Sequence, residues 1–243
     1  MARRPVWTAA CTAPESGGPA DAAFLPGFES DHASGPEACP FFLREEPEFA
    51  WNGGFALSQH RKNIAGLHAA FLEEHPGLRI LEASSKSESE LGRALSAFRL
   101  TIRTKTRTFS VESAYQAAKV FERGGPYPDL LDLPARDAKR DPRLKAGGEI
   151  VGFSLMGYDF PTVPRSYFYN WLYVNALALH PDLAERAAAF DAFTDITFNP
   201  ARQVSCQAEA LAIYTGLVRL GRLEEALSGK EAFLAVVYPG AVS

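Results

Sequence analysis

One apolar run constrains the fold of this chain more than any other feature. Residues 167–179 are almost all apolar, and the run ends at His180-Pro181. A helix at the surface of a globular protein carries a polar face, whereas a helix that is apolar on all sides needs neighbours around it. The run is also shorter than the ~20 residues that span a bilayer. We therefore predict a helix that is buried on most sides within a folded domain.

Hydrophobic spacing predicts the elements around this helix. The periodicity of apolar residues and the positions of Ser, Gly and Pro predict further helices at 57–74, from Ser110 to before Gly124, 182–190, 204–220 and from about 222 onward. Strands are predicted at 79–83 and 97–104. The pattern lacks internal repeats and strand–helix alternation, so it indicates an α+β fold, a mainly α-helical single domain with a small sheet.

The first 48 residues differ from the rest of the chain. Residues 1–48 are rich in Pro, Gly and Ala, a composition that predicts a loosely packed N-terminal arm. Residues 49–243 are predicted to form the functional domain.

Composition excludes several classes of protein. With 25 basic and 29 acidic residues the net charge is −4, which excludes a basic nucleic-acid coat protein. The 243 residues include three widely spaced cysteines, so neither a disulfide framework nor a zinc site is indicated. The start of the chain lacks the apolar stretch of a signal peptide and no run is long enough to span a membrane. We expect a reduced, cytoplasmic protein without membrane contact.

The common cofactor and nucleophile motifs are also missing. The sequence contains no phosphate-binding glycine loop of the P-loop or dinucleotide type, no H-E-x-x-H and no G-x-S-x-G. Its five histidines do not have the spacing of metal ligands. We therefore expect neither a metal nor a cofactor, and chemistry carried out by ordinary carboxylate, amide and amine groups.

The segment 109–121 carries such groups at helical spacing. Glu112, Tyr115, Gln116 and Lys119 lie at i, i+3, i+4 and i+7 and would form one stripe of a helix. Ser110 can cap that helix, and Glu112 is favourably placed in its first turn. Spacing alone is more typical of a solvated face with a Glu–Lys pair, so by itself it makes the stripe no more than a candidate site.

These residues also carry a family resemblance. The run from Val111 to Lys119, V-E-S-A-Y-Q-A-A-K, resembles the S-E-x-x-[FY]-Q-A-x-K core of the NADAR family, with Val111 in place of the first Ser. Ser96-Ala97-Phe98 is similar to the upstream S-N-F of that family, with Ala97 in place of Asn. The basic segment 135–140 and the run that ends in His180-Pro-Asp-Leu183 resemble later family elements. The resemblance implies the NADAR fold and cleavage of N-glycosidic bonds.

Further segments resemble one branch of that family, the antitoxins of DarT-type DNA ADP-ribosyltransferases. These segments are residues 51–59, 63–68, 84–87, 95–98, 191–200 and 206–208. The resemblance implies removal of ADP-ribose from the guanine base in DNA. ADP-ribosylated DNA would be the substrate, ADP-ribose the product and a cognate toxin the partner.

Such a reaction gives each candidate catalytic residue a role. Cleavage of a ribosyl C–N bond builds positive charge at the anomeric carbon. Glu112 can stabilise that charge or act as acid and base. Lys119 can form a Schiff base with the opened sugar, donate a proton or hold a phosphate, and Gln116 can orient a water or a ribose hydroxyl.

Several other residues are candidates for substrate binding. Residues 136–145 contain five basic residues against Asp137 and Asp141, and Arg136 and Arg140 within them can meet the pyrophosphate or the DNA backbone. The remaining candidates are polar or aromatic residues of the family-like segments: Trp51, Lys86, Ser96, Phe98, Tyr115, Asp195, Asn199 and Gln207. Each of them also has a purely structural interpretation, as a turn, core or surface residue.

Three hypotheses for function follow. The first is a hydrolase that removes ADP-ribose from guanine in DNA. The second is an N-glycosidase for small phosphorylated ribosyl metabolites, such as intermediates of the riboflavin pathway. The third is a binding module for ADP-ribose without catalysis, which the presence of both Glu112 and Lys119 disfavours.

Overall fold

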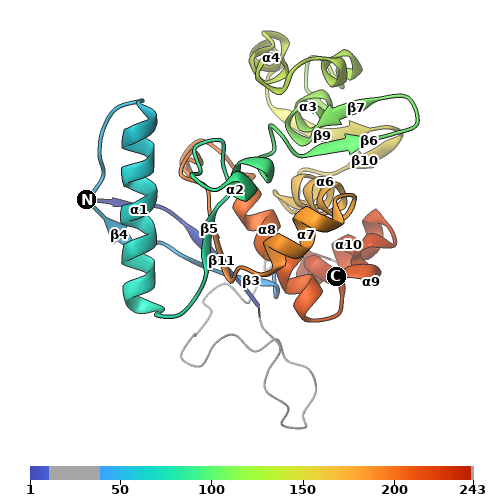
Figure 1. Ribbon diagram of the computed structural model, residues 1–243. Coiled ribbons are helices and arrows are strands. Elements are labelled where there is room, and N and C mark those ends of the chain that lie inside the picture. Colours follow the sequence, from blue (N-terminus) through green and yellow to red (C-terminus); the bar gives the residue numbers. More distant parts are fainter. Residues whose placement is uncertain (11–38, 242–243) are drawn as a thin grey trace.

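The apolar run at 167–179 is an internal helix of the molecule. The computed structural model describes residues 1–10 and 39–241, in which this run forms α6, Tyr167–Ala178. Nine of its side chains are buried, among them Leu172, Tyr173 and Leu177. It packs against α8, Gln207–Arg219, which is itself buried over most of its length (Figure 1). The predicted internal helix is confirmed.

Helices hold more of the described residues than strands do. In addition to α6 and α8 they are α1 (Leu57–Glu74), α2 (Glu90–Ala94), α3 (Val111–Ala117), η1 (Pro128–Asp132), α4 (Ala135–Arg140), α5 (Arg143–Ala146), α7 (Pro181–Ala188), α9 (Leu223–Leu227), α10 (Lys230–Val237) and η2 (Pro239–Ala241). The helix predicted at 57–74 has the predicted ends, and those predicted at 182–190 and 204–220 begin and end within three residues of the prediction. With its small sheets the fold is α+β, as predicted.

A four-stranded sheet lies beside α8 and joins strands from distant parts of the chain. Its strand order is β3-β2-β11-β5, from Phe42–Glu45, Val6–Ala9, Ala192–Thr194 and Ile80–Glu82. β2 is antiparallel to both of its neighbours, and β11 is parallel to β5. A two-stranded ribbon of β1 (Ala2–Arg3) and β4 (Glu48–Phe49) extends this region towards α1.

These strands differ from the loosely packed arm predicted for residues 1–48. All four residues of β2 are buried, and β3 pairs with β2 along its whole length. The physical reason is pairing with distant strands, which composition does not encode. The middle of the predicted arm, residues 11–38, lies outside the described residues, so the domain boundary at residue 48 stays a prediction.

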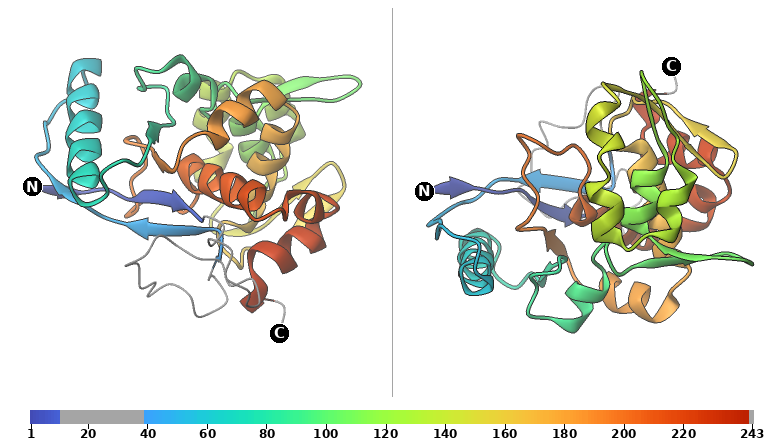
Figure 2. Two further views of the ribbon diagram at one scale, coloured as in Figure 1. Left: turned by 60° about the horizontal axis from the view of Figure 1, so that its bottom comes forward. Right: turned by 90° about the horizontal axis from the view of Figure 1, so that it is seen from above.

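A second group of strands surrounds α3. β6 (Thr101–Arg103) and β7 (Thr108–Ser110) form a hairpin that projects from the body of the molecule (Figures 1 and 2). β8 (Lys119–Phe121), β9 (Ile150–Leu155) and β10 (Tyr158–Phe160) form an antiparallel sheet of order β10-β9-β8. Thus α3 begins directly after β7 and ends directly before β8.

Two of the predicted boundaries were wrong in this region. The strand predicted at 97–104 is confined to Thr101–Arg103, because Ala97 and Leu100 turn into the core. The helix predicted to run from Ser110 to near Gly124 ends at Ala117, because Lys119–Phe121 pair with β9. Within residues 1–10 and 39–241, no helix combines the length and the apolar character that crossing a membrane requires.

Candidate active site

A cavity of about 390 Å³ lies where α3, α4 and the segment between β11 and α8 meet. Its size is within the range of about 300–1,000 Å³ that is typical of small-molecule sites. The residues that line it are Ser85, Ser96, Phe98, Glu112, Tyr115, Gln116, Lys119, Lys139, Leu144, Ile150, Tyr169, Asp195, Thr197, Phe198, Arg202, Gln203, Val204, Ser205 and Gln207.

The start of α3 places Glu112 in this cavity. The Ser110 hydroxyl caps the helix by accepting a hydrogen bond from the Ser113 backbone N–H at 3.0 Å, as predicted from the sequence. The Glu112 backbone N–H donates to the Ala97 carbonyl at 2.9 Å, which fixes the helix start to the loop before β6. The Glu112 residue is only 5% exposed, so its carboxylate lies in a site largely shielded from bulk water.

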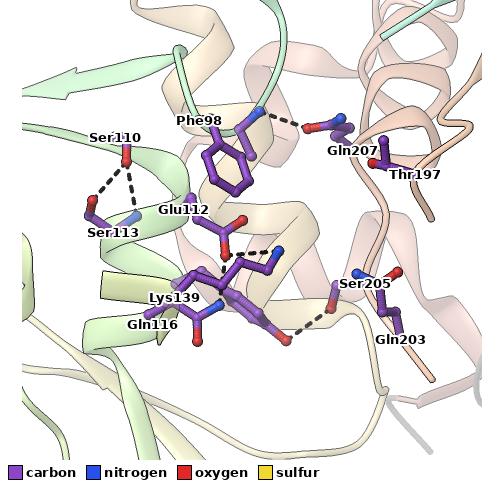
Figure 3. Close-up of polar contacts among 12 residues, drawn as sticks. Phe98, Ser110, Glu112, Ser113, Gln116, Lys139, Thr197, Gln203, Ser205 and Gln207 are labelled. Atoms are coloured by element: carbon purple, nitrogen blue, oxygen red, sulfur yellow. Dashed lines mark hydrogen bonds and ion pairs between the residues drawn. The ribbon is translucent and has the colours of Figure 1, made fainter. Parts of the chain in front are cut away.

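Glu112 is the first member of a polar chain (Figure 3). Its Oε1 accepts a hydrogen bond from Gln116 Nε2 at 2.7 Å and lies 3.3 Å from Lys139 Nζ. Gln116 Oε1 in turn accepts from Lys119 Nζ at 2.8 Å. The acid, amide and amine predicted from spacing are therefore in contact, although Lys119 reaches them from β8 rather than from the helix.

Lys119 is the group in this chain of contacts whose pKa the fold changes most clearly. Burial lowers the pKa to about 8; nearby Glu112 opposes this change, and Lys139 makes a smaller contribution that lowers it. Its Nζ also lies 4.7 Å from the centre of the Tyr115 ring, which packs against Phe153 and Tyr169. The lower pKa increases the neutral fraction of the amine near physiological pH, and the neutral form is the one that a nucleophilic lysine needs.

Gln207 and Asp195 form the opposite wall. Gln207 Oε1 accepts from the Ala97 backbone N–H at 2.7 Å, and its Nε2 donates to the Ala83 carbonyl and to Asp195 Oδ2. Gln207 therefore joins the loop before β6, the end of β5 and the segment after β11. Asp195 Oδ1 accepts from the backbone N–H and the hydroxyl of Thr197.

A second buried carboxylate lies behind this wall. Glu82 accepts hydrogen bonds from the Thr194 hydroxyl at 2.7 Å and from the Ile196 backbone N–H at 2.9 Å. Burial and the nearby Asp195 raise the pKa of Glu82 to about 8. Burial also raises the pKa of Asp195. The wall therefore contains two neighbouring buried carboxyl groups, Glu82 and Asp195. Burial disfavours a negative charge on both of them at once.

Comparison with known families shows which family this fold belongs to. Residues 34–243 match the family model described as DarT1-associated NADAR antitoxin. The chain belongs to the NADAR-DarT1 family. No match was found among curated proteins. The resemblance inferred from residues 111–119 is confirmed, and it extends over most of the chain.

In this NADAR-DarT1 protein, eight of the thirteen residues predicted for the site line one cavity. They are Ser96, Phe98, Glu112, Tyr115, Gln116, Lys119, Asp195 and Gln207. They come from four separate segments of the chain, so the family-like segments converge in space.

The other five predicted residues lie outside the lining. Lys86 is next to the lining residue Ser85, and Arg136 and Arg140 are exposed on α4 beside Lys139. Asn199 lies in the loop that contributes Arg202 and Gln203. The fifth residue, Trp51, packs on Phe49 and under the Arg4 guanidinium instead. Their roles in binding stay predictions.

Lys139 is the main site residue that the sequence analysis did not select. It lay within the basic segment 136–145, from which Arg136 and Arg140 were chosen. The position of residues around the helix could have indicated it. Ala138 is small and apolar and turns into the core, and the next residue, Lys139, then faces the cavity. Its ammonium group also lies 5.1 Å from the centre of the Phe98 ring.

Among the residues that the structure describes, one group of side chains has the composition of a metal site. It consists of Glu45, Glu74 and His75, with His75 Nε2 2.9 Å from Glu45 Oε2. None of the three lines the cavity of the NADAR-DarT1 protein.

Proposed function

We propose that this protein hydrolyses the N-glycosidic bond between ADP-ribose and the guanine base in DNA, and so reverses the modification made by a cognate ADP-ribosyltransferase toxin. The observation that carries the proposal is the contact chain from Glu112 through Gln116 to Lys119 inside a cavity. Membership of the NADAR-DarT1 family supports the choice of substrate.

The reaction can be written with the residues of this cavity. A proton relayed from water through Glu112 reaches the ring oxygen of the ribose, the C–O bond of the ring opens, and the anomeric carbon forms an imine with the guanine amino nitrogen. The neutral amine of Lys119 adds to that carbon, and the guanine amino group leaves with a proton returned through Glu112. Water then hydrolyses the Lys119 imine and releases ADP-ribose, so one water is consumed for each bond that is cleaved. No step requires an oxidant, a metal or a cofactor.

The remaining lining residues suit the rest of the substrate. Lys139 and Arg202 supply positive charge for the pyrophosphate, and Arg136 and Arg140 lie on the same helix as Lys139. Phe98 and Tyr115 offer ring faces for the sugar or a base. Gln116 contacts both catalytic groups and keeps them at a fixed separation.

The test is release of ADP-ribose from a guanine-ADP-ribosylated oligonucleotide by the purified protein. We expect turnover by the wild type and a loss of about 10²–10⁴-fold in Glu112→Gln, the range for removal of a general acid–base group. The matched control is Glu224→Gln, an exposed position on α9, which should keep wild-type activity.

Two results would contradict the proposal. Tight binding of the modified oligonucleotide without release of ADP-ribose would leave a binding module. Turnover of small phosphorylated ribosides without turnover of modified DNA would make the protein a metabolite N-glycosidase.

A further inference from the structure

The segment that leads from α2 to α3 has an unusual charge for this chain. Residues 91–111 contain Arg93, Arg99, Arg103, Lys105 and Arg107 and no acidic residue, although the whole chain has a net charge of −4. The last four of these basic residues are exposed. A local surplus of this kind favours a polyanionic partner such as a nucleic-acid backbone.

The β6–β7 hairpin presents three of these charges on a defined support. Figures 1 and 2 show that it projects from the body of the molecule. Two hydrogen bonds between Thr104 and Arg107 close its turn. The Thr104 backbone N–H donates to the Arg107 carbonyl at 2.8 Å, and the Arg107 backbone N–H donates to the Thr104 hydroxyl at 3.0 Å. The Arg103, Lys105 and Arg107 side chains therefore extend from an ordered turn.

Little of this charge is neutralised within the protein. Arg107 Nη1 lies 3.6 Å from Asp132 Oδ2, and both side chains are about half exposed. Arg103 and Lys105 form no ion pair with the residues that the structure describes. Exposed ion pairs contribute little, so all three cations remain free to bind phosphates.

A hollow of about 740 Å³ lies against this turn. The hairpin contributes Thr104, Lys105, Thr106 and Arg107 to it, and the opposite side is formed by Ala117, Pro126, Pro128, Leu131, Ser154, Leu155, Met156 and Gly157. The floor is largely apolar, with Met156 55% exposed, and the rim carries two cations. An apolar surface beside cations matches the base and the phosphate of a nucleotide.

The hollow and the candidate active site share α3. Gln116 lines the cavity and the next residue, Ala117, lines the hollow. A helix with its side chains is about 10–12 Å across, and phosphates along one B-form strand are about 3.4 Å apart along the axis. A span of one helix diameter therefore corresponds to about three nucleotides of one DNA strand.

The hairpin is also joined directly to the wall of the cavity. Phe98 lies three residues before β6, and Glu112 lies two residues after β7. A DNA strand that the hairpin binds is therefore held at a fixed position relative to the cavity.

We propose that the hollow beside the β6–β7 hairpin is a second nucleotide-binding site, which holds the DNA strand a few nucleotides from the ADP-ribosylated guanine. This inference rests on the proposed function, because that function makes DNA the substrate. It adds the place at which the unmodified part of the DNA binds.

The first test compares substrates of different length. The wild type should have a higher kcat/KM for an ADP-ribosylated oligonucleotide of about ten nucleotides than for the ADP-ribosylated mononucleotide. Arg103→Gln/Lys105→Gln should lower kcat/KM for the oligonucleotide about tenfold and leave that for the mononucleotide unchanged. Arg3→Gln/Lys62→Gln removes the same charges at the opposite end of the molecule and should behave like the wild type.

The second test uses an unmodified oligonucleotide and needs no catalysis. Fluorescence anisotropy at several salt concentrations should give a slope of log K against log salt that is smaller by about 1.4 in Arg103→Gln/Lys105→Gln, the change expected for two lost contacts to a single strand. Met156→Glu places a negative charge at the exposed floor of the hollow and should weaken binding of the same oligonucleotide.

The outcomes separate this inference from the proposed function. Wild-type DNA binding and wild-type oligonucleotide turnover in both the hairpin variant and the Met156 variant would overturn the second site. If those variants also failed to bind the toxin, the basic hairpin would be assigned to a protein partner. Hairpin-dependent DNA binding without any release of ADP-ribose would uphold the second site and reject the hydrolase.

Discussion

Burial acts in opposite directions on two kinds of side chain in this molecule. It removes water from the Lys119 amine and so favours the neutral form, which lowers its pKa to about 8. It removes water from the Glu82 carboxyl and again favours the neutral form, which raises its pKa to about 8. One of these groups faces the cavity and the other supports its wall, so each has a distinct experimental signature.

The pH dependence of turnover tests the role of Lys119. Below pH 8 the neutral fraction of an amine with that pKa rises about tenfold per pH unit. We expect kcat/KM to rise with this slope between pH 6 and 8 and to level above pH 8. Lys119→Arg keeps the charge but cannot form an imine, so it should be inactive.

Initial rates between pH 6 and 9.5 provide the measurement, and borohydride reduction during turnover should add the mass of the sugar adduct to Lys119. An active Lys119→Arg variant would exclude the covalent route while leaving hydrolysis of the bond intact.

The pH dependence of stability tests Glu82. Its folded-state pKa of about 8 is raised above the unfolded value of 4.5, so its contribution to stability is complete below pH 4.5 and is lost as the pH rises towards 8. We expect the Tm to fall over this range, by about 2–4 °C for each kcal/mol lost in a chain of this size.

Glu82→Gln is the matched variant. The amide oxygen can still accept from the Ile196 N–H and the amide nitrogen can donate to the Thr194 hydroxyl, without a charge at any pH. The Tm of Glu82→Gln, measured by circular dichroism from pH 4.5 to 8, should fall less steeply with pH than the Tm of the wild type. A wild-type slope in this variant would locate the titration elsewhere.

Among the elements, α8 depends on one close approach to the sheet. Gly216 lies in α8, and a Cβ at this position would be 2.4 Å from the Phe41 carbonyl oxygen, next to β3. The absence of a side chain lets the helix lie against the backbone that leads into the strand. Since α8 begins at Gln207, this contact also fixes the helix that supplies one wall of the cavity.

Gly216→Ala should therefore destabilise the fold. The backbone atom cannot move aside easily, so we expect a cost of about 1–3 kcal/mol, typical of overpacking in a core. Chemical denaturation would measure it. Gly53→Ala, where a Cβ would meet nothing within 4 Å, serves as the control, and equal stability of the two variants would contradict the close-packing argument.

At the scale of the whole molecule, the N-terminal strand supports the candidate active site from a distance. β2 lies between β3 and β11, and its Trp7 is 1% exposed. The Trp7 ring packs edge-on against Phe198 with ring centres 5.7 Å apart, and Phe198 lines the cavity. The first ten residues thus help to hold a wall built more than 180 residues later.

Trp7→Ala should lower both stability and activity. Removal of a buried Trp costs about 3–5 kcal/mol, and the loss of support for Phe198 should raise KM. Denaturation and steady-state kinetics would measure the two effects. Trp51→Ala, at a position 40% exposed, should cost much less stability, and a similar cost at both positions would argue against a supporting role of β2.

The sequence by itself determined the features that depend on neighbouring residues. The buried helix at 167–179, the Ser110 cap and the contact between Glu112 and Gln116 all follow from periodicity, capping and spacing within about ten residues. The resemblance carried by residues 111–119 indicated the family for the same reason, since the polar groups that define it lie close together along the chain.

Only the tertiary structure decided which distant segments meet. It ended α3 at Ala117 by pairing the next residues with β9, and it turned Lys139 rather than Arg136 towards the cavity. It also buried β2 in the middle of a sheet and joined Ala97, Ala83 and Asp195 through Gln207. Such contacts are stabilised by partners far along the chain, and no local pattern records which partners those are.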